Sequence, residues 1–498
     1  MPIVLGIDLG TQSLKALIYD TETKTIVANA SSPVEIIQSS NGAAEQKAEW
    51  WLAALEHCFA QLSDDAKQRI AAVGVSGQQH GFVPVGTNGD VLANVKLWCD
   101  TTTSAECEEI MSILGGREAC VAKTGNAIVP GYTAPKILWL KKHKPDAYAQ
   151  MCTVMLPHDY LNFHLGGVRA MEFGDASGTG LLDIENRRWH SEAINAIDDS
   201  GKLAACLPPL HEGLSPIGAV TKKIADRYGI PAGIPISPGG GDNMMGAIGT
   251  GNVGEGIVTM SLGSSGTAYA SSDKAVFDSQ ERLAAFCSST GGWLPLLCTM
   301  NCTLTTELTR NVLDSSLVEM EALVAATPIG SHGVLTMPFF NGERIPNLPQ
   351  AKGNILGLDS GNYTRANLLR SAMEGATFGL KLGMEALDEA GMEIREIRLI
   401  GGGSKSASWR QIVADICNAQ VVGLKQDEGA AFGAALQAFA ALQVKEGRSV
   451  DIGTLTQQHV TLDRSKGHQP VAENVLAYTE VYEKYKQAVG VISQLYAG

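Results

Sequence analysis

The sequence predicts an α/β protein with two related domains, and three observations support this fold class. The chain has 498 residues, and chains of this length usually fold into more than one domain, each with its own hydrophobic core. The N-terminal stretch IVLGIDLGTQSLKALIYD has a counterpart near the middle of the chain, IVTMSLGSSGTAYASS. After each copy, short apolar runs typical of strands alternate with longer segments of helical periodicity. We therefore expect one domain over residues 1–247 and a second over residues 248–498.

Each copy of the repeat has the pattern of a β-hairpin: an apolar run, a glycine turn and a second apolar run. The aligned turns are rich in glycine, hydroxyl and amide residues: Gly10, Thr11 and Gln12 in the first copy, and Gly263, Ser264 and Ser265 in the second. Such turns expose backbone N–H groups, so two of them facing each other could bind a polyphosphate from both sides. Asp8, which aligns with Ser261, directly precedes the first turn. It is a candidate for holding a divalent cation through water, and the alternative is a turn-starting aspartate.

The first 75 residues predict three strands, a helix and a fourth strand. Apolar runs cover residues 3–7, 14–19 and 25–30, AEWWLAALEHCFAQL has helical spacing, and RIAAVGVSG is typical of a buried strand. This order of elements is the opening of a ribonuclease-H-like domain. The less regular residues 100–230 predict a helical, loop-rich insertion that covers a cleft.

The segment IPISPGGGDNMMGAIGTG predicts a strand that runs through three glycines into a helix. Asp242 begins that helix and has the chemistry of a general base, which takes a proton from an attacking hydroxyl. Asn243 can donate to and accept from a polyol. The alternative for Asp242 is a simple helix cap, but a cap does not require three glycines.

The second half repeats the scheme. EIRLIGGGSKSASWRQIVADI reads as strand, glycine turn and helix, and VVGLKQDEGAAFGAALQAFAAL as strand, turn and helix. The first of these turns, Gly401, Gly402, Gly403 and Ser404, would suit a flat base or a phosphate, and an ordinary β–α turn is the alternative. The last helix, over residues 474–495, has one apolar face for packing.

Polar residues also follow strands in the first half. Gln79 and His80 come after RIAAVGVSG, and Asp100 lies in WCDTTT. Polar groups at strand ends are where a sugar could be recognised. The alternatives are a structural histidine and a capping aspartate.

Composition narrows the class of protein. The formal net charge is −14 and no block of Lys and Arg occurs, so neither nucleic acid nor an anionic membrane is an expected partner. The ten cysteines lack metal-ligand spacing, which predicts reduced thiols in a cytoplasmic protein and no zinc site. The N-terminus MPIVLGIDLG has no basic region and enters an apolar run at once, so we expect no signal peptide, and no apolar run in the sequence reaches about 18 residues, so we expect no transmembrane helix.

Taken together, these motifs resemble the FGGY family of carbohydrate kinases along nearly the whole chain. The more specific pieces are GQQHG, TGNAIVPGYTAPKILWL, LPHDYL, DASGTGLLD, GGGDNMMGA, SLGSSG, FNGERIPN and GGGSKSASWRQIVADI. The resemblance implies two actin-like domains, each with a ribonuclease-H-like core, around a central cleft. It also implies phosphoryl transfer from ATP, with Mg²⁺, to a sugar hydroxyl.

The resemblance implies roles for the residues already noted. Asp242 matches the catalytic base and Asp8 the carboxylate on the metal side. Sugar-contacting positions match Gln79, His80, Asp100 and Asn243, and nucleotide-binding turns match Thr11, Gln12, Gly263, Ser264, Ser265, Gly401, Gly402, Gly403 and Ser404. A homodimer is also compatible with it.

Within the family, the motifs are most similar to members that convert D-xylulose to D-xylulose 5-phosphate. Many such members have Met where this chain has Gln79, and some have Gly-Arg where it has Thr101 and Thr102. Other ketoses or polyols, namely D-ribulose, L-ribulose and glycerol, are alternatives. Members that act on glycerol carry Arg-Glu in place of His80 and Gly81, which disfavours glycerol.

Two alternatives belong to other functional classes. An actin-like ATPase of the chaperone or filament type would phosphorylate no small molecule, and GGGDNMMGA and GQQHG argue against it. A sugar sensor would lack phosphotransfer, and the presence of both Asp8 and Asp242 argues against that.

Overall fold

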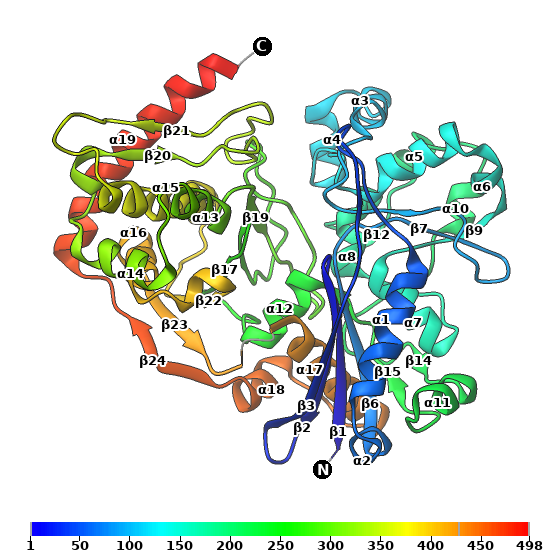
Figure 1. The fold of residues 1–498 in the computed structure, drawn as a ribbon. Coiled ribbons are helices and arrows are strands. Elements are labelled where there is room, and N and C mark those ends of the chain that lie inside the picture. The colour runs from blue at the N-terminus through cyan, green and yellow to red at the C-terminus, as the bar shows by residue number, and fades with distance from the viewer. Residues whose placement is uncertain (1, 427–428, 497–498) are drawn as a thin grey trace.

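The computed structural model describes residues 2–426 and 429–496, which form two lobes, each built around one large β-sheet (Figure 1). The sheet of the first lobe, on the right in Figure 1, has the strand order β14–β15–β6–β1–β2–β3, and β16 also pairs with β6. Its strands are β1 (Ile3–Leu9), β2 (Ser13–Asp20), β3 (Thr25–Pro33), β6 (Ile70–Gly77), β14 (Gly218–Ala219), β15 (Pro235–Ile236) and β16 (Gly240–Gly241).

The predicted order of three strands, a helix and a strand is present in this lobe. Strands β1, β2 and β3 are antiparallel neighbours, whereas β6 returns parallel to β1. The helix between them, α1 (Ala48–Gln61), buries Trp51, Leu55 and Phe59 in the core beside the sheet. Two short strands that the sequence analysis did not predict, β4 (Ile37–Gln38) and β5 (Ala44–Gln46), precede α1.

The second lobe repeats this architecture with the strand order β19–β18–β17–β22–β23–β24. Its strands are β17 (Ile257–Leu262), β18 (Gly266–Ala270), β19 (Leu296–Thr299), β22 (Glu396–Ile400), β23 (Gln420–Leu424) and β24 (Leu462–His468). Ser261 pairs with Thr267 one step before the turn, as Asp8 pairs with Lys15 in the first lobe. The sequence repeat is therefore a structural repeat, and both glycine turns join the first two strands of a sheet.

Two helices pack on the second sheet, α15 (Arg365–Glu389) and α16 (Ala407–Cys417), and a third, α19 (Ala472–Tyr496), packs on these two helices. The predicted C-terminal helix corresponds to α19. It buries the apolar face that its periodicity indicated: Tyr478, Tyr482, Tyr485, Val489 and Ile492.

Helices α12 (Asp242–Thr250) and α17 (Gly429–Lys445) lie between the two sheets (Figure 1). Although α17 follows a strand of the second sheet, it packs against β1 and β6 of the first. A Cβ atom on Gly6 would lie 1.9 Å from the carbonyl oxygen of Ala431, and one on Gly433 would lie 1.8 Å from that of Met245. Glycines thus allow direct backbone contact at the junction of the lobes. The turn predicted before α17 includes residues 427 and 428, which lie outside the described residues.

The insertion between β6 and β15 is helical and rich in loops, as predicted. Its main elements are β7 (Val83–Gly86), α3 (Ser104–Ile113), α4 (Arg117–Thr124), α5 (Thr133–His143), α6 (Pro145–Gln150), β9 (Met151–Met155), α7 (Pro157–Gly166), α8 (Phe173–Ala176) and α11 (Lys222–Tyr228). A segment from the second half of the chain packs against this insertion: the Asn126 side chain makes two hydrogen bonds with the backbone of Ala285. The predicted domain boundary between residues 247 and 248 falls within α12 and stays a prediction.

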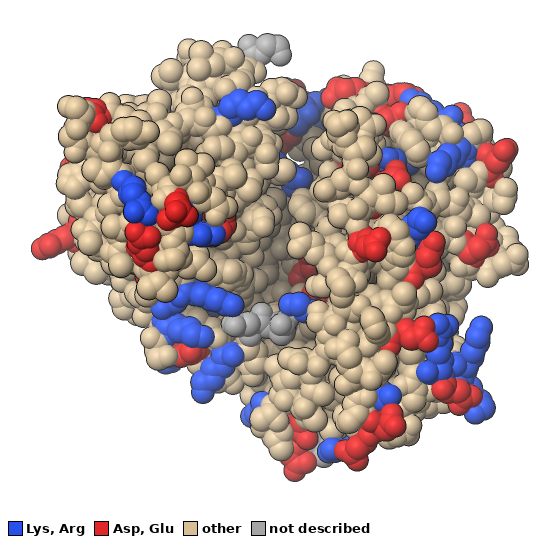
Figure 2. Space-filling model, in the orientation of Figure 1, with Lys and Arg blue, Asp and Glu red and all other residues tan. Residues whose placement is uncertain are grey.

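A space-filling view shows a hollow between the two lobes (Figure 2). All ten cysteines are free thiols in the described part of the chain. Among the described helices, none is both long and apolar enough to span a lipid bilayer.

Candidate active site between the lobes

The two carboxylates that the sequence analysis singled out lie at the same edge of the first sheet. In the strand register, Asp8 is the partner of Ser76, and Ser76 is in turn the partner of Gly240. Asp242 begins α12 two residues after Gly240. The hydroxyl of Ser76 donates a 2.8 Å hydrogen bond to Oδ1 of Asp8. Because β1, β6 and β16 run parallel, their carboxyl ends bring Asp8 and Asp242 to one place, the usual location of ligand sites in such sheets.

The environment of Asp242 suits a general base. Burial, together with the negative charges of Asp8 and Asp175, raises the pKa of its carboxyl to about 7. Oδ1 accepts hydrogen bonds from the backbone N–H of Asn243 at 2.8 Å and from its side-chain Nδ2 at 3.0 Å. A carboxylate that titrates near neutral pH is matched to taking a proton from a hydroxyl at that pH.

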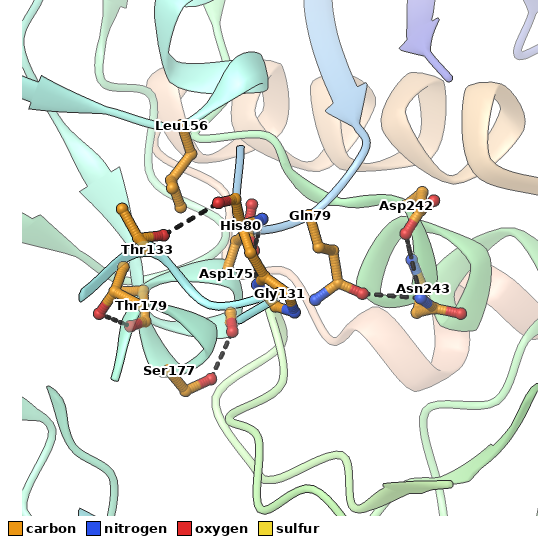
Figure 3. A network of polar contacts seen from close by, with 12 residues as sticks. Gln79, His80, Gly131, Thr133, Leu156, Asp175, Ser177, Thr179, Asp242 and Asn243 are labelled. Atoms are coloured by element: carbon orange, nitrogen blue, oxygen red, sulfur yellow. Dashed lines mark hydrogen bonds and ion pairs between the residues drawn. The ribbon is translucent and has the colours of Figure 1, made fainter. Parts of the chain in front are cut away.

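Gln79, Asn243 and Asp242 form a continuous row of polar side chains beside His80 (Figure 3). Nδ2 of Asn243 donates a 2.6 Å hydrogen bond to Oε1 of Gln79. The other end of the Gln79 amide, Nε2, is buried and has no hydrogen-bond partner among the described residues. Gly241 is required here, since a Cβ at this position would lie 2.6 Å from Cγ of Gln79. The row therefore presents an unused buried donor, which a ligand acceptor could satisfy.

His80 is held in an unusual backbone conformation three residues after the end of β6. Its φ angle is +64°, which a residue other than glycine rarely adopts. Its carbonyl oxygen accepts hydrogen bonds from Oγ1 of Thr133 at 3.1 Å and from Nζ of Lys136 at 2.9 Å. The imidazole packs against the rings of Tyr132 and Phe286, with ring centroids 5.2 and 5.5 Å apart. Burial lowers the pKa of His80, although the nearby carboxylate of Asp175 acts in the opposite direction.

Asp100 differs from the other predicted sugar-side residues because its carboxylate is already saturated. It is fully buried and accepts hydrogen bonds from the backbone N–H of Ala44 and from Nζ of Lys96, at 2.9 and 3.2 Å. Thr102 donates two more, from its N–H at 3.0 Å and its hydroxyl at 2.5 Å. Burial alone would raise the pKa of Asp100, but the hydrogen bonds from Thr102 and Ala44 lower it. The structure thus shows an anchor for the loop after Trp98, and direct sugar contact by Asp100 stays a prediction.

In the glycine turn of the first lobe, the side chain of Thr11 is already hydrogen-bonded to residues of the same lobe. The hydroxyl of Thr11 donates to Oε1 of Gln78 and accepts from Nε1 of Trp98, both at 3.0 Å. Gln12 is exposed.

The two glycine turns of the second lobe are in contact with each other. A Cβ on Gly401 would lie 2.8 Å from the backbone of Leu262, directly before the turn that contains Gly263, Ser264 and Ser265. The carbonyl oxygens of Gly263 and Ser264 accept hydrogen bonds from the backbone at the start of α13 (Thr303–Val312) and from Cys302. Gly402 is exposed, and a Cβ there would meet no atom within 4 Å. The structure therefore brings 263–265 and 401–404 together beside open space.

Sequence reasoning missed several residues around His80. Lys136 has no exposed surface, and its ammonium also donates to the carbonyl of Gly131 at 2.6 Å. In the sequence it cannot be told apart from the other lysines of the same segment. Burial lowers the pKa of Lys136 to about 7. Asp175 and Phe286 are distant from His80 in sequence. The motif DASGTGLLD was the only sequence signal for Asp175, and no signal indicated Phe286. Arg344, within FNGERIPN, belongs to the second lobe, and its positive charge contributes to the lowered pKa of His80.

Comparison with protein families identifies the class of protein to which this chain belongs. Residues 3–249 match the N-terminal domain of the FGGY family of carbohydrate kinases, and residues 264–442 match its C-terminal domain. The chain therefore belongs to the FGGY family of carbohydrate kinases. This confirms the predicted family, its sugar-kinase activity and the two-domain actin-like fold.

Individual relatives are similar over their full length. The xylulose kinase of Haemophilus influenzae is 42% identical, with 99% of this chain and 100% of the relative covered. The xylulose kinase of Bacillus subtilis is 32% identical, covering 98% of this chain and 96% of the relative. Among solved structures, the xylulose kinase from Rhodospirillum rubrum superposes with a TM-score of 0.89 at 25% identity, and all of both chains is covered.

Proposed function

We propose that this kinase transfers the γ-phosphoryl group of ATP to the terminal hydroxyl of D-xylulose and forms D-xylulose 5-phosphate. The sugar is inferred from the full-length similarity to xylulose kinases. The observation that carries the chemistry is Asp242, whose pKa of about 7 and position beside Asp8, Gln79 and Asn243 suit a base at a hydroxyl-binding site.

In the proposed reaction, the sugar binds along the row of Gln79, Asn243 and His80. Asp242 accepts the proton of the terminal hydroxyl while that oxygen attacks the γ-phosphorus of ATP. The bond from the γ-phosphorus to the bridging oxygen breaks, and ADP leaves with that electron pair. The expected sugar contact of Asp100 is part of this proposal, as is the assignment of residues 1–247 and 248–498 to the two domains.

The residues present fit ATP. Gly402 provides open space for a flat base, and the adjoining turns can supply backbone N–H groups and hydroxyls to phosphates: Gly263, Ser264, Ser265, Gly401, Gly403 and Ser404 from the second lobe, and Thr11 and Gln12 from the first. The use of ATP favours a cytoplasmic location. A homodimer stays a prediction.

The residues also fit Mg²⁺ bound mainly by phosphates and water. The described residues contain no cluster of three or more His, Cys, Asp or Glu side chains that could hold a metal by themselves. One carboxylate, Asp8, next to the proposed phosphate turns is the donor set that Mg²⁺ commonly uses with a nucleotide. When bound, the ion would neutralise charge on the phosphates.

The experiment that tests this function is ADP release with a panel of acceptors: D-xylulose, D-ribulose, L-ribulose, glycerol and no sugar. We expect D-xylulose to give the highest kcat/KM, with ADP release that depends on sugar. Asp242→Ala should lower kcat by about 10²-fold or more, while ATP binding persists. Equal turnover on glycerol would contradict the substrate, and release independent of sugar would indicate an ATPase of another class.

A further inference from the structure

The carboxylate of Asp175 lies behind His80, on the side away from the row of Gln79 and Asn243 (Figure 3). Asp175 is on α8, has no exposed surface and comes within 3.2 Å of Nδ1 of His80 through its Oδ1. The same oxygen lies 3.4 Å from the backbone nitrogen of His80. One carboxylate oxygen therefore faces both the ring and the main chain of the residue with the strained φ angle.

The rest of the imidazole is enclosed by packing. Gly178 leaves room for the ring, because a Cβ at this position would lie 1.9 Å from Cε1 of His80. Tyr132 and Phe286 contact the ring from other directions. Since the neighbours restrict rotation, the orientation of the ring is set, and only its protonation pattern is left to be decided by Asp175.

We propose that Asp175 is a positioning residue that keeps His80 in the tautomer with the proton on Nδ1, so that Nε2 accepts a hydrogen bond from a substrate hydroxyl. An ionised carboxylate has no proton to donate, and a lone pair on Nδ1 would face its negative oxygen at 3.2 Å, so the carboxylate favours the proton on the nearer ring nitrogen. The other nitrogen is then an acceptor and selects a donor such as a sugar hydroxyl. This inference rests on the proposed function for the identity of the sugar, but not for the tautomer.

A second histidine, His158, also contacts the carboxylate of Asp175 and therefore affects the outcome of substituting Asp175. Oδ2 of Asp175 lies 3.4 Å from Nδ1 of His158, whose Nε2 is 2.9 Å from Oδ1 of Asp159. Burial would lower the pKa of His158, but the carboxylates of Asp159 and Asp175 raise it well above its usual value. His158 therefore lies between two carboxylates that favour its charged form, in which both ring nitrogens carry a proton.

This arrangement predicts the outcome of Asp175→Asn, which has one acceptor oxygen in place of two. His158 and His80 would compete for that oxygen, and the charged donor forms the stronger hydrogen bond. The amide NH₂ would then face Nδ1 of His80 and force the proton to Nε2. Two donors, the ring N–H and the sugar hydroxyl, would meet at the binding site.

The kinetic test compares Asp175→Asn with Asp198→Asn at pH 8, where Asp242 is mostly ionised. Asp198 is a matched control, since it is a buried carboxylate of the same lobe that accepts from Tyr148 and Lys141 and does not contact His80. We expect Asp175→Asn to raise KM for D-xylulose by roughly 10- to 100-fold, the effect of an unpaired buried polar group, with KM for ATP within about twofold. Asp198→Asn should change neither. Equal increases in both KM values, or an unchanged KM for the sugar, would overturn the proposal.

A direct test reads the tautomer in the wild-type protein, and a variant serves only to assign the signals. ¹⁵N-histidine labelling distinguishes the two ring nitrogens of each of the ten histidines, and comparison with His80→Gln assigns the His80 signals. We expect the Nδ1–H tautomer in the ligand-free protein, whereas an Nε2–H signal would refute the inference. The spectrum does not depend on the substrate, so a failure of D-xylulose as acceptor would contradict the proposed function alone.

Discussion

The raised pKa of Asp242 predicts that its removal stabilises the protein. Burial and the charges of Asp8 and Asp175 make the ionised carboxylate unfavourable in the folded chain, where its pKa is about 7, compared with about 3.9 in an unfolded chain. Between these two values the folded state binds a proton that the unfolded state does not. The contribution of Asp242 to stability is therefore full below about pH 4 and is lost as the pH rises through 7.

The magnitude follows from about three pH units at about 1.4 kcal/mol each, which sets an upper limit of about 4 kcal/mol. Partial exposure of the side chain reduces this, so we expect Asp242→Asn to be more stable than wild type by about 2–4 kcal/mol at pH 8. The isosteric amide oxygen can still accept from Asn243. At pH 5 most of the wild-type carboxyl is protonated in the folded state, and the difference should shrink by about 2 kcal/mol.

The assay is thermal unfolding of ligand-free protein in EDTA at pH 5 and pH 8. At about 2–4 °C for each kcal/mol in a domain of this size, Asp242→Asn should melt several degrees above wild type at pH 8. Asp100→Asn is the control of opposite sign, because its carboxylate accepts four hydrogen bonds and its pKa is lowered. It should be destabilised by about 3 kcal/mol. A lower melting temperature for Asp242→Asn at pH 8, or the same difference at both pH values, would refute the reasoning.

Three further predictions concern Asp8 and two glycines. Asp8→Asn should raise the Mg²⁺ concentration needed for half-maximal activity and lower kcat, because a neutral amide binds the ion poorly; an unchanged Mg²⁺ titration would reduce Asp8 to a turn residue. Gly402→Leu, whose Cβ meets no atom within 4 Å, should leave the melting temperature unchanged and raise KM for ATP by about tenfold, while KM for the sugar stays constant. Gly433→Ala should destabilise the protein by about 3 kcal/mol, because its Cβ would lie 1.8 Å from the carbonyl oxygen of Met245. Gly490→Ala, in α19 with open space around it, is the matched control, and equal melting temperatures for the two variants would contradict the packing argument.

The sequence analysis predicted what periodicity and local repeats encode. Apolar runs and helical spacing correspond to β1, β2, β3, α1 and β6, and the repeated hairpin corresponds to equivalent strands in both lobes. The glycine triplet before Asp242 marked a strand that continues into a helix, since a Cβ at Gly239 would meet the backbone of Val75 and one at Gly240 or Gly241 would meet neighbouring side chains. Such signals are local, so a single sequence is enough to recognise them.

Contacts between distant segments could not be predicted in this way. Nothing local indicates that Asp175 lies against the ring of His80 while Lys136 bonds its carbonyl oxygen, or that Phe286 from the second half of the chain contacts the ring. The state of Asp100 was equally hidden, because its donor Ala44 lies 56 residues away on the unpredicted strand β5. The residue type alone does not indicate whether tertiary packing buries a side chain, and only the folded structure distinguishes buried residues from exposed ones.

The arrangement of the elements bears on how the proposed reaction avoids water. Asp8, Gln79 and Asp242 lie on, or within two residues of, the paired strands β1, β6 and β16 of one sheet, so their mutual geometry is independent of the width of the hollow between the lobes. The turns around Gly263 and Gly402 belong to the other sheet. The proposed base and hydroxyl would therefore be aligned before the γ-phosphate arrives, and only approach of the second lobe would bring the phosphorus to the oxygen. Transfer to water would be disfavoured because the phosphate is delivered to a position that the sugar already fills.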